Sequence, residues 1–352
     1  MTLRVSLTDT HRALTRPAHN AHLRWPERRA CIITLESDDG WRGRGEAAPL
    51  PGFSPDTLAA CRAALEALDP AGIPANLAPG REVLAELERV SAALPSALPA
   101  ARCALEAALL ELWSSALGLP AWALLSAAPP EARAVTALLQ GEPEHALDAA
   151  ERAHERGLRC FKLKVGRAGA LERELAALAG IRGAWGDRVD VRLDANQSFS
   201  GAQARAALPR FAAYAPEFIE EPCPPAQLAT LGELALPLAL DESLALSEPN
   251  ALPSRPLRAL ILKPTLLGGI SGCARWAVEA RRIGAELVLS HAFEGPLGLS
   301  LSAALALAFG SRTLAHGLDA DGAQLTAVEL PALRGAQITP WSEPGWGVPG
   351  PG

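Results

Sequence analysis

Five charged side chains recur through the middle of the chain, each at the end of a short apolar run and about one strand and one helix apart. They are Lys164, Asp194, Glu220, Asp241 and Lys263. Three carboxylates gathered in one cavity repel each other and raise at least one pKa unless a cation neutralises them. All three are oxygen donors with no His or Cys among them, which selects Mg²⁺ or Mn²⁺ over zinc. The pattern therefore predicts a magnesium site, with Mn²⁺ as a substitute ion.

The lysines beside the acids predict proton transfer. Lys162 and Lys164 share one face of a strand, while Phe161 and Leu163 share the other. An ammonium group near a divalent cation and a second ammonium loses its proton more readily, which suits a lysine to act as a base. Each charged residue alone could be a surface ion pair. Because five recur in register, we expect Lys162, Lys164 and Lys263 to be catalytic.

Several further polar residues near strand ends have weaker assignments. Asn196 and Glu242 could hydrogen-bond to the site or serve as a simple cap or salt bridge, and both interpretations stay open. Arg192 is expected to be an internal partner of the carboxylates rather than a substrate ligand. For His291 and His316, structural roles are favoured over catalysis.

The elements that must position these residues alternate in type after about residue 130. Short apolar runs at 134–140, 161–166, 189–196, 217–222, 236–243, 259–264 and 286–295, with a weaker one near 311–315, predict strands. Amphipathic stretches at 143–156, 169–183, 200–213 and 271–283 predict helices. Repeated strand–helix units indicate a parallel barrel, whose active site lies where the carboxyl ends of the strands meet. The charged side chains would converge there.

The first part of the chain predicts a separate module. Residues 1 to about 45 alternate as strands do, and from Ser54 to about Leu125 the pattern is helical, with Ser54 and Pro55 expected as the N-cap and first-turn proline of the first helix. We expect an α/β fold, a modified TIM barrel (β/α)₇β with an N-terminal α+β capping domain. The predicted boundaries are 1–127 for the cap, 128–317 for the barrel, and 318–352 for a segment that returns to the cap.

Composition excludes several classes of protein. A length of 352 residues suggests two domains, and a mild net charge of −6 with mixed signs leaves no polybasic face for nucleic acid or anionic lipid. Six scattered cysteines without a C-x-x-C pair indicate buried thiols in a reducing compartment. No apolar run approaches a signal peptide or the ~20 residues of a membrane helix. We expect a cytoplasmic protein that acts on a small carboxylate, with homo-oligomerisation left open.

The motifs together resemble a known family. K-x-K (162–164), D-x-N (194–196), E-E-P (220–222), D-E-S (241–243) and L-K-P (262–264) are similar to the muconate-lactonizing subgroup of the enolase superfamily, over nearly the whole chain. Within it, 43–57, 263–269, 290–298 and 316–319 resemble the o-succinylbenzoate synthases. These usually read S-S-x-x-E-S on the seventh strand, whereas this chain has His291 at the second position and Gly295 at the last. The change lies where the substrate would bind.

The resemblance implies syn dehydration of 2-succinyl-6-hydroxy-2,4-cyclohexadiene-1-carboxylate to o-succinylbenzoate, a lyase reaction of menaquinone biosynthesis. Lys164 matches the base of the family, Lys162 should tune it, and Lys263 should stack its ammonium on the ring intermediate. Mg²⁺ held by the three acids would stabilise the enediolate, as in enolase-superfamily enzymes generally.

The loop of the capping domain is expected to close the mouth and contact the succinyl arm. The residues expected to bind substrate are Leu50, Pro51, Gly52, Phe53, Ser54, Gly268, Gly269, Ser290 and Glu294. An ordinary Pro-Gly turn is the alternative for the loop. N-acylamino-acid racemisation or dipeptide epimerisation would use the same lysines, because both need an amine on each side of an α-carbon. A barrel that binds an anion without turnover is a further alternative.

Overall fold

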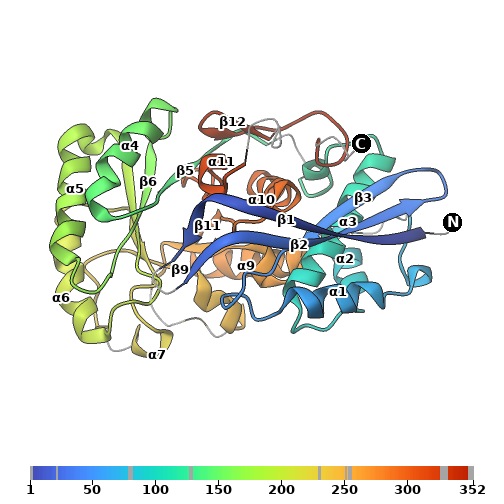
Figure 1. The fold of residues 1–352 in the computed structure, drawn as a ribbon, viewed down its shortest axis with the longest axis horizontal. Coiled ribbons are helices and arrows are strands. Elements are labelled where there is room, and N and C mark those ends of the chain that lie inside the picture. The colour runs from blue at the N-terminus through green and yellow to red at the C-terminus, as the bar shows by residue number, and fades with distance from the viewer. Residues whose placement is uncertain are drawn as a thin grey trace.

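The computed structural model describes residues 3–20, 23–77, 82–126, 130–228, 231–249, 252, 256–325 and 332–347. A small antiparallel sheet with its helices lies on one side, and a parallel barrel with its surrounding helices lies on the other (Figure 1). The predicted α/β class, capping module and barrel are confirmed.

The capping module is built from strands followed by helices. Its elements are β1 (Leu3–His19), β2 (Arg24–Ser37), β3 (Arg42–Ala47), α1 (Leu58–Glu66), α2 (Val83–Ser91) and α3 (Pro99–Ala116). Alternate residues of β2, Cys31, Ile33 and Leu35, are fully buried in the core that includes α3, as period-two alternation requires. β3 lies so close to α3 that a Cβ added to Gly45 would lie 1.8 Å from the carbonyl oxygen of Ala104.

The first helix begins later than the sequence suggests. Thr57 is the N-cap of α1, and its side chain accepts the backbone N–H of Ala60 at 3.2 Å. The hydroxyl oxygen of Ser54 accepts the N–H of Leu50 at 2.8 Å instead. The predicted cap at Ser54 and Pro55 is therefore wrong, because Ser54 closes the preceding loop.

Seven parallel strands form the barrel wall. In spatial order they are β5 (Thr136–Leu139), β6 (Cys160–Lys164), β7 (Asp190–Asp194), β8 (Phe218–Glu220), β9 (Leu238–Leu240), β10 (Ala259–Leu262) and β11 (Glu286–Leu289). His316 and Gly317 connect the two edges. The N–H of Thr136 donates to the oxygen of His316, and the N–H of Gly317 donates to the oxygen of Leu289. Residues 316 and 317, directly after the weak segment predicted near 311–315, therefore join the two edges of the barrel.

Helices cover the outside of the barrel. They are α4 (Ala146–Glu155), α5 (Leu171–Trp185), α6 (Gly201–Ala212), α7 (Pro225–Leu228), α8 (Pro264–Leu267), α9 (Gly269–Ile283), α10 (Pro296–Phe309) and α11 (Ala320–Ala323). A capping box of Ser200 and Gln203 begins α6. Within the described ranges, no helix is both long enough and apolar enough to traverse a bilayer.

The C-terminal part of the described chain returns to the capping module. β12 (Leu333–Arg334) pairs with β13 (Gln337–Ile338), which pairs with β4 (Arg133–Ala134) just before the barrel. Further on, the indole N–H of Trp346 donates to the carbonyl oxygen of Arg44 in β3.

The β1–β2 hairpin reaches from the capping module to the barrel (Figure 1). Arg12 and Arg28 both donate to the carbonyl oxygen of Phe293, in the loop after β11. Glu46 of β3 accepts the N–H groups of Gly295 and Gly298 at the start of α10, where the helix dipole favours a carboxylate. The cap thus fixes the loop that follows the seventh strand.

Candidate active site

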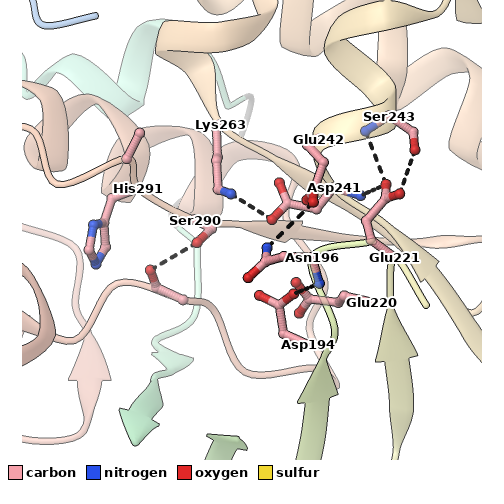
Figure 2. A network of polar contacts seen from close by, with 12 residues as sticks. Asp194, Asn196, Glu220, Glu221, Asp241, Glu242, Ser243, Lys263, Ser290 and His291 are labelled. Carbon is pink, nitrogen blue, oxygen red and sulfur yellow. Dashed lines mark hydrogen bonds and ion pairs between the residues drawn. The ribbon is translucent and has the colours of Figure 1, made fainter. Parts of the chain in front are cut away.

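Three carboxylates meet at the carboxyl ends of adjacent strands. The register of β7 and β8 pairs Asp194 with Glu220, and Asp241 follows β9 directly. One oxygen from each lies within 4.8 Å of the others, and all three side chains are buried (Figure 2). An all-oxygen set of this size fits one hard divalent cation. The structure therefore brings together the three residues predicted to bind the metal.

Lysines flank the acids from two directions. From β6, Lys162 Nζ lies 2.5 Å from a Glu220 oxygen and 2.8 Å from an Asp194 oxygen, and Lys164 Nζ lies 2.5 Å from that same Asp194 oxygen. Lys263, directly after β10, places its Nζ 2.5 Å from Asp241 (Figure 2). Amines thus stand on either flank of the acid cluster.

The electrostatics of the cluster favour an added cation. Burial alone would lower the pKa of Lys162, but attraction to the acids outweighs it, so that pKa is raised. Burial, with repulsion from Asp194 and Asp241, raises the pKa of Glu220 to about 7. Burial, with repulsion from Asp241, raises the pKa of Glu242 to about 8. A divalent ion would lower both pKa values, because it would relieve the part of each increase that comes from repulsion between the acids.

Asn196 joins Lys164 to the acids. Its side-chain oxygen accepts from Lys164 Nζ at 2.7 Å. Its Nδ2 donates to Glu242 at 3.4 Å (Figure 2). Its backbone N–H donates to Asp194 at 3.0 Å. Asn196 therefore orients both Lys164 and a proposed metal ligand.

Arg192 has a different partner from the expected one. Its side chain is buried inside the barrel, where its Nε lies 2.6 Å from Glu217 and its Nη1 donates to the carbonyl oxygen of Ala315. The expectation that Arg192 pairs with the three acids is corrected. Because Arg192 precedes Asp194 by two positions on the same face of the strand, it lies one layer deeper in the barrel.

Glu221 is a polar residue of the site that the sequence reasoning missed. It is fully buried, with a φ of 43°. One oxygen accepts the backbone N–H groups of Asp241 at 2.8 Å and Ser243 at 3.0 Å, and the other accepts the Ser243 hydroxyl at 2.5 Å (Figure 2). Gln197 also donates to it, at 3.1 Å. Its position as the second acid of E-E-P was the available signal.

A cavity lies above the lysines and is roofed by the capping module. Leu50 and Phe53 line it, and the Phe53 ring centroid lies 5.2 Å from Lys263 Nζ. Trp25 of β2 also lines it, packing against Phe53 with ring centroids 6.3 Å apart and planes at 79°. Phe293 contributes from the barrel side. The sequence analysis did not predict that Trp25 lines the cavity, because the residues around it in β2 do not indicate that it packs against the loop containing Phe53.

The other loop residues expected to bind substrate support the cavity from outside. The carbonyl oxygen of Pro51 accepts the Trp25 indole N–H at 2.8 Å, and Ser54 caps the N–H of Leu50. Gly52 has a φ of 74° and lines a neighbouring pocket. This segment is therefore an ordered loop whose tip packs against the cap.

Of the barrel residues expected to bind substrate, one lines the cavity and the others lie outside its wall. Ser290 lines the cavity. Glu294 is buried below it and accepts the N–H of Ala292 at 2.6 Å. Gly268 and Gly269 do not line it: a Cβ on Gly269 would lie 2.7 Å from a Glu106 oxygen in the capping module. Gly269 allows close packing of α9 against α3, and a substrate contact by Gly268 or Gly269 stays a prediction.

Fold and site together define a capped barrel with an acidic, lysine-flanked centre at the carboxyl ends of its strands. Residues 145–349 match the family described as Enolase C-terminal domain-like. The chain belongs to the enolase superfamily. Members of this superfamily use Mg²⁺, and the three acids could bind such an ion.

The relatives of this chain are named for different activities. The o-succinylbenzoate synthase of Desulfotalea psychrophila is 31% identical over 292 residues, covering 74% of this chain and 78% of that protein. The L-Ala-D/L-Glu epimerase of Bacillus subtilis is 26% identical, covering 82% and 80%. The structure of the muconate lactonizing enzyme from Pseudomonas fluorescens complexed with muconolactone superposes with a TM-score of 0.82 at 24% identity, covering 98% and 95%.

Proposed function

We propose that this protein is a Mg²⁺-dependent o-succinylbenzoate synthase, a lyase that dehydrates 2-succinyl-6-hydroxy-2,4-cyclohexadiene-1-carboxylate in menaquinone biosynthesis. The observation that carries the proposal is the acid cluster flanked by lysines beneath an aromatic roof. The cluster of Asp194, Glu220 and Asp241 would hold the ion. The bound ion would supply positive charge that stabilises negative charge developing on the ring carboxylate.

The lysines would carry out the proton transfers. Lys164 Nζ would take the proton from the carbon that bears the ring carboxylate, and the resulting ammonium would give that proton to the departing hydroxyl. One water is lost, and the ring becomes aromatic. Lys263, on the other flank, would keep its ammonium against the ring intermediate. Lys162, bound to Asp194 and Glu220, would keep positive charge beside the base.

The cavity wall favours an aromatic ring over a dipeptide. Trp25, Phe53 and Phe293 provide apolar surface for a ring. A dipeptide carries an α-ammonium group, which a carboxylate partner would stabilise. Asp319 is the only described residue with a carboxylate in the wall of this cavity, and Arg156 binds its two oxygens at 2.8 and 2.9 Å. This pairing supports a substrate without an ammonium group.

N-acylamino-acid racemisation remains the second candidate, because its substrates also lack a free ammonium group. A lysine on each flank of the cluster suits removal of a proton from one face and its return on the other. The epimerase of Bacillus subtilis is 26% identical to this chain over 80% of its own length. Substrate choice therefore separates these reactions, whereas the lysines do not.

The test is parallel turnover of three substrate types. Purified protein with Mg²⁺ is given the cyclohexadiene substrate, an N-succinyl amino acid and a dipeptide in separate reactions. We expect rapid aromatisation of the first, and no aromatisation by the Lys164→Ala variant. Racemisation or epimerisation without aromatisation would reject the proposal.

A further inference from the structure

His291 presents one N–H group to the cavity. The residue lines the cavity and is only 9% exposed. Its Nδ1 accepts the backbone N–H of Phe293 at 3.0 Å, so the proton of the neutral ring is on Nε2. No residue in the described ranges accepts a hydrogen bond from Nε2. Figure 2 shows the imidazole set apart from the acids, with Ser290 and Lys263 between them in this view.

The imidazole is also held in a fixed orientation. The ring of Phe293 packs edge-on against it, with centroids 5.2 Å apart and planes at 79°. Phe293 has a φ of 61°, and Arg12 and Arg28 of the capping module bind its carbonyl oxygen at 3.2 and 3.1 Å. A donor held by packing and by a constrained backbone gives more specificity than one on a mobile loop.

The charge around His291 suits an anion. Burial, together with the positive charges of Lys263, Lys162, Arg12 and Arg28, lowers the pKa of His291 to about 3. The ring is therefore neutral near pH 7 in a region of positive potential. Such a region attracts an anionic oxygen, and the N–H group gives that oxygen a direction.

We propose that His291 is a specificity-determining residue that donates its Nε2–H to the carboxylate at the end of the substrate arm. This rests on the proposed function, because o-succinylbenzoate carries its second carboxylate on a succinyl arm. The acid cluster and its ion then engage one end of the substrate, and His291 engages the other.

The test compares two ligands that differ only at the end of the arm. One is o-succinylbenzoate, and the other is 2-butanoylbenzoate, in which a methyl group replaces the terminal carboxylate. Their Kd values are measured by calorimetry with Mg²⁺ for wild type, His291→Phe and His291→Gln. His291→Phe keeps a ring but removes the donor, whereas His291→Gln keeps an N–H. His154→Phe, an aromatic replacement in α4, is the matched control.

We expect His291→Phe to weaken o-succinylbenzoate binding by about tenfold or more, as loss of a hydrogen bond to a charged group predicts, with 2-butanoylbenzoate unchanged. His291→Gln should restore part of the difference, and His154→Phe should match wild type. Turnover by His291→Phe should show a raised KM with a smaller change in kcat. Equal weakening of both ligands, or of neither, would overturn the proposal.

The two proposals fail in different ways. If wild type aromatises the cyclohexadiene substrate but His291→Phe binds o-succinylbenzoate as tightly as wild type, only the role of His291 is refuted. If wild type neither aromatises that substrate nor binds o-succinylbenzoate, the proposed function itself is rejected, and the role of His291 is rejected with it.

Discussion

Replacing Glu221 by glutamine should weaken Mg²⁺ binding although Glu221 is not itself a proposed ligand. The substitution keeps the shape of the side chain and removes its negative charge. One Glu221 oxygen holds the backbone N–H of Asp241 at 2.8 Å and that of Ser243 at 3.0 Å, which fixes the turn that presents the Asp241 carboxylate. A misplaced turn would move a metal ligand.

The magnitude follows from the two backbone hydrogen bonds. Each is charge-assisted in Glu221 and neutral in the variant, a difference of about 1 kcal/mol per bond. If the energy lost from both hydrogen bonds appears as poorer placement of the Asp241 carboxylate, the Mg²⁺ affinity decreases by up to about 30-fold. The Ser243 hydroxyl can rotate to accept from the new amide, so it adds little to the loss.

Calorimetric titration of metal-free protein with Mg²⁺ measures the effect, and Glu106→Gln is the matched control. Glu106 is fully buried too, and it accepts the N–H of Ser271 at 2.9 Å and the hydroxyl of Ser91 at 2.7 Å, but it lies between cap and barrel. Both variants should lose stability to urea, and only Glu221→Gln should lose metal affinity. Mg²⁺ affinity of Glu221→Gln within twofold of wild type would refute the reasoning.

Three further perturbations test other parts of the structure. Lys164→Ala should abolish dehydration with Mg²⁺ affinity nearly intact; activity within tenfold of wild type would show that another group is the base. Burial lowers the pKa of His316 from 6.5 to about 3. Below pH 6.5 the unfolded chain therefore binds a proton that the folded chain excludes. The free energy of unfolding should then fall toward pH 4 by up to about 1.4 kcal/mol per pH unit. His316→Gln should flatten that slope in urea unfolding, and identical slopes would contradict the assignment. Gly45→Ala should destabilise the cap by about 1–3 kcal/mol, because the added Cβ would overlap α3. Gly72→Ala is the control, because its added Cβ would meet no atom within 4 Å. Equal melting temperatures for the two variants would contradict this packing.

The barrel and the acid cluster were predictable because each strand carries its own local signal. From Phe161 to Lys164 apolar and charged residues alternate, and the carboxyl ends of parallel strands must share one edge. These two facts are enough to bring Asp194, Glu220 and Asp241 together before any contact is known.

The remaining features depend on contacts between distant segments, which local patterns do not encode. Trp25 belongs to β2 but roofs the cavity, and Gly269 belongs to α9 but packs on α3. Ser54 resembles a helix cap in sequence, yet Thr57 takes that role because Ser54 closes its own loop. Arg192 lies on the same face of its strand as Asp194, but it lies deeper in the barrel and pairs with Glu217 instead of the three acids.

Asp194, Glu220 and Asp241 should together bind one divalent ion. A crystal of the protein grown with Mn²⁺ and measured at the manganese absorption edge tests this directly. We expect one anomalous peak within about 2.0–2.4 Å of one oxygen from each acid. A peak bound elsewhere, or no peak at saturating Mn²⁺, would contradict it.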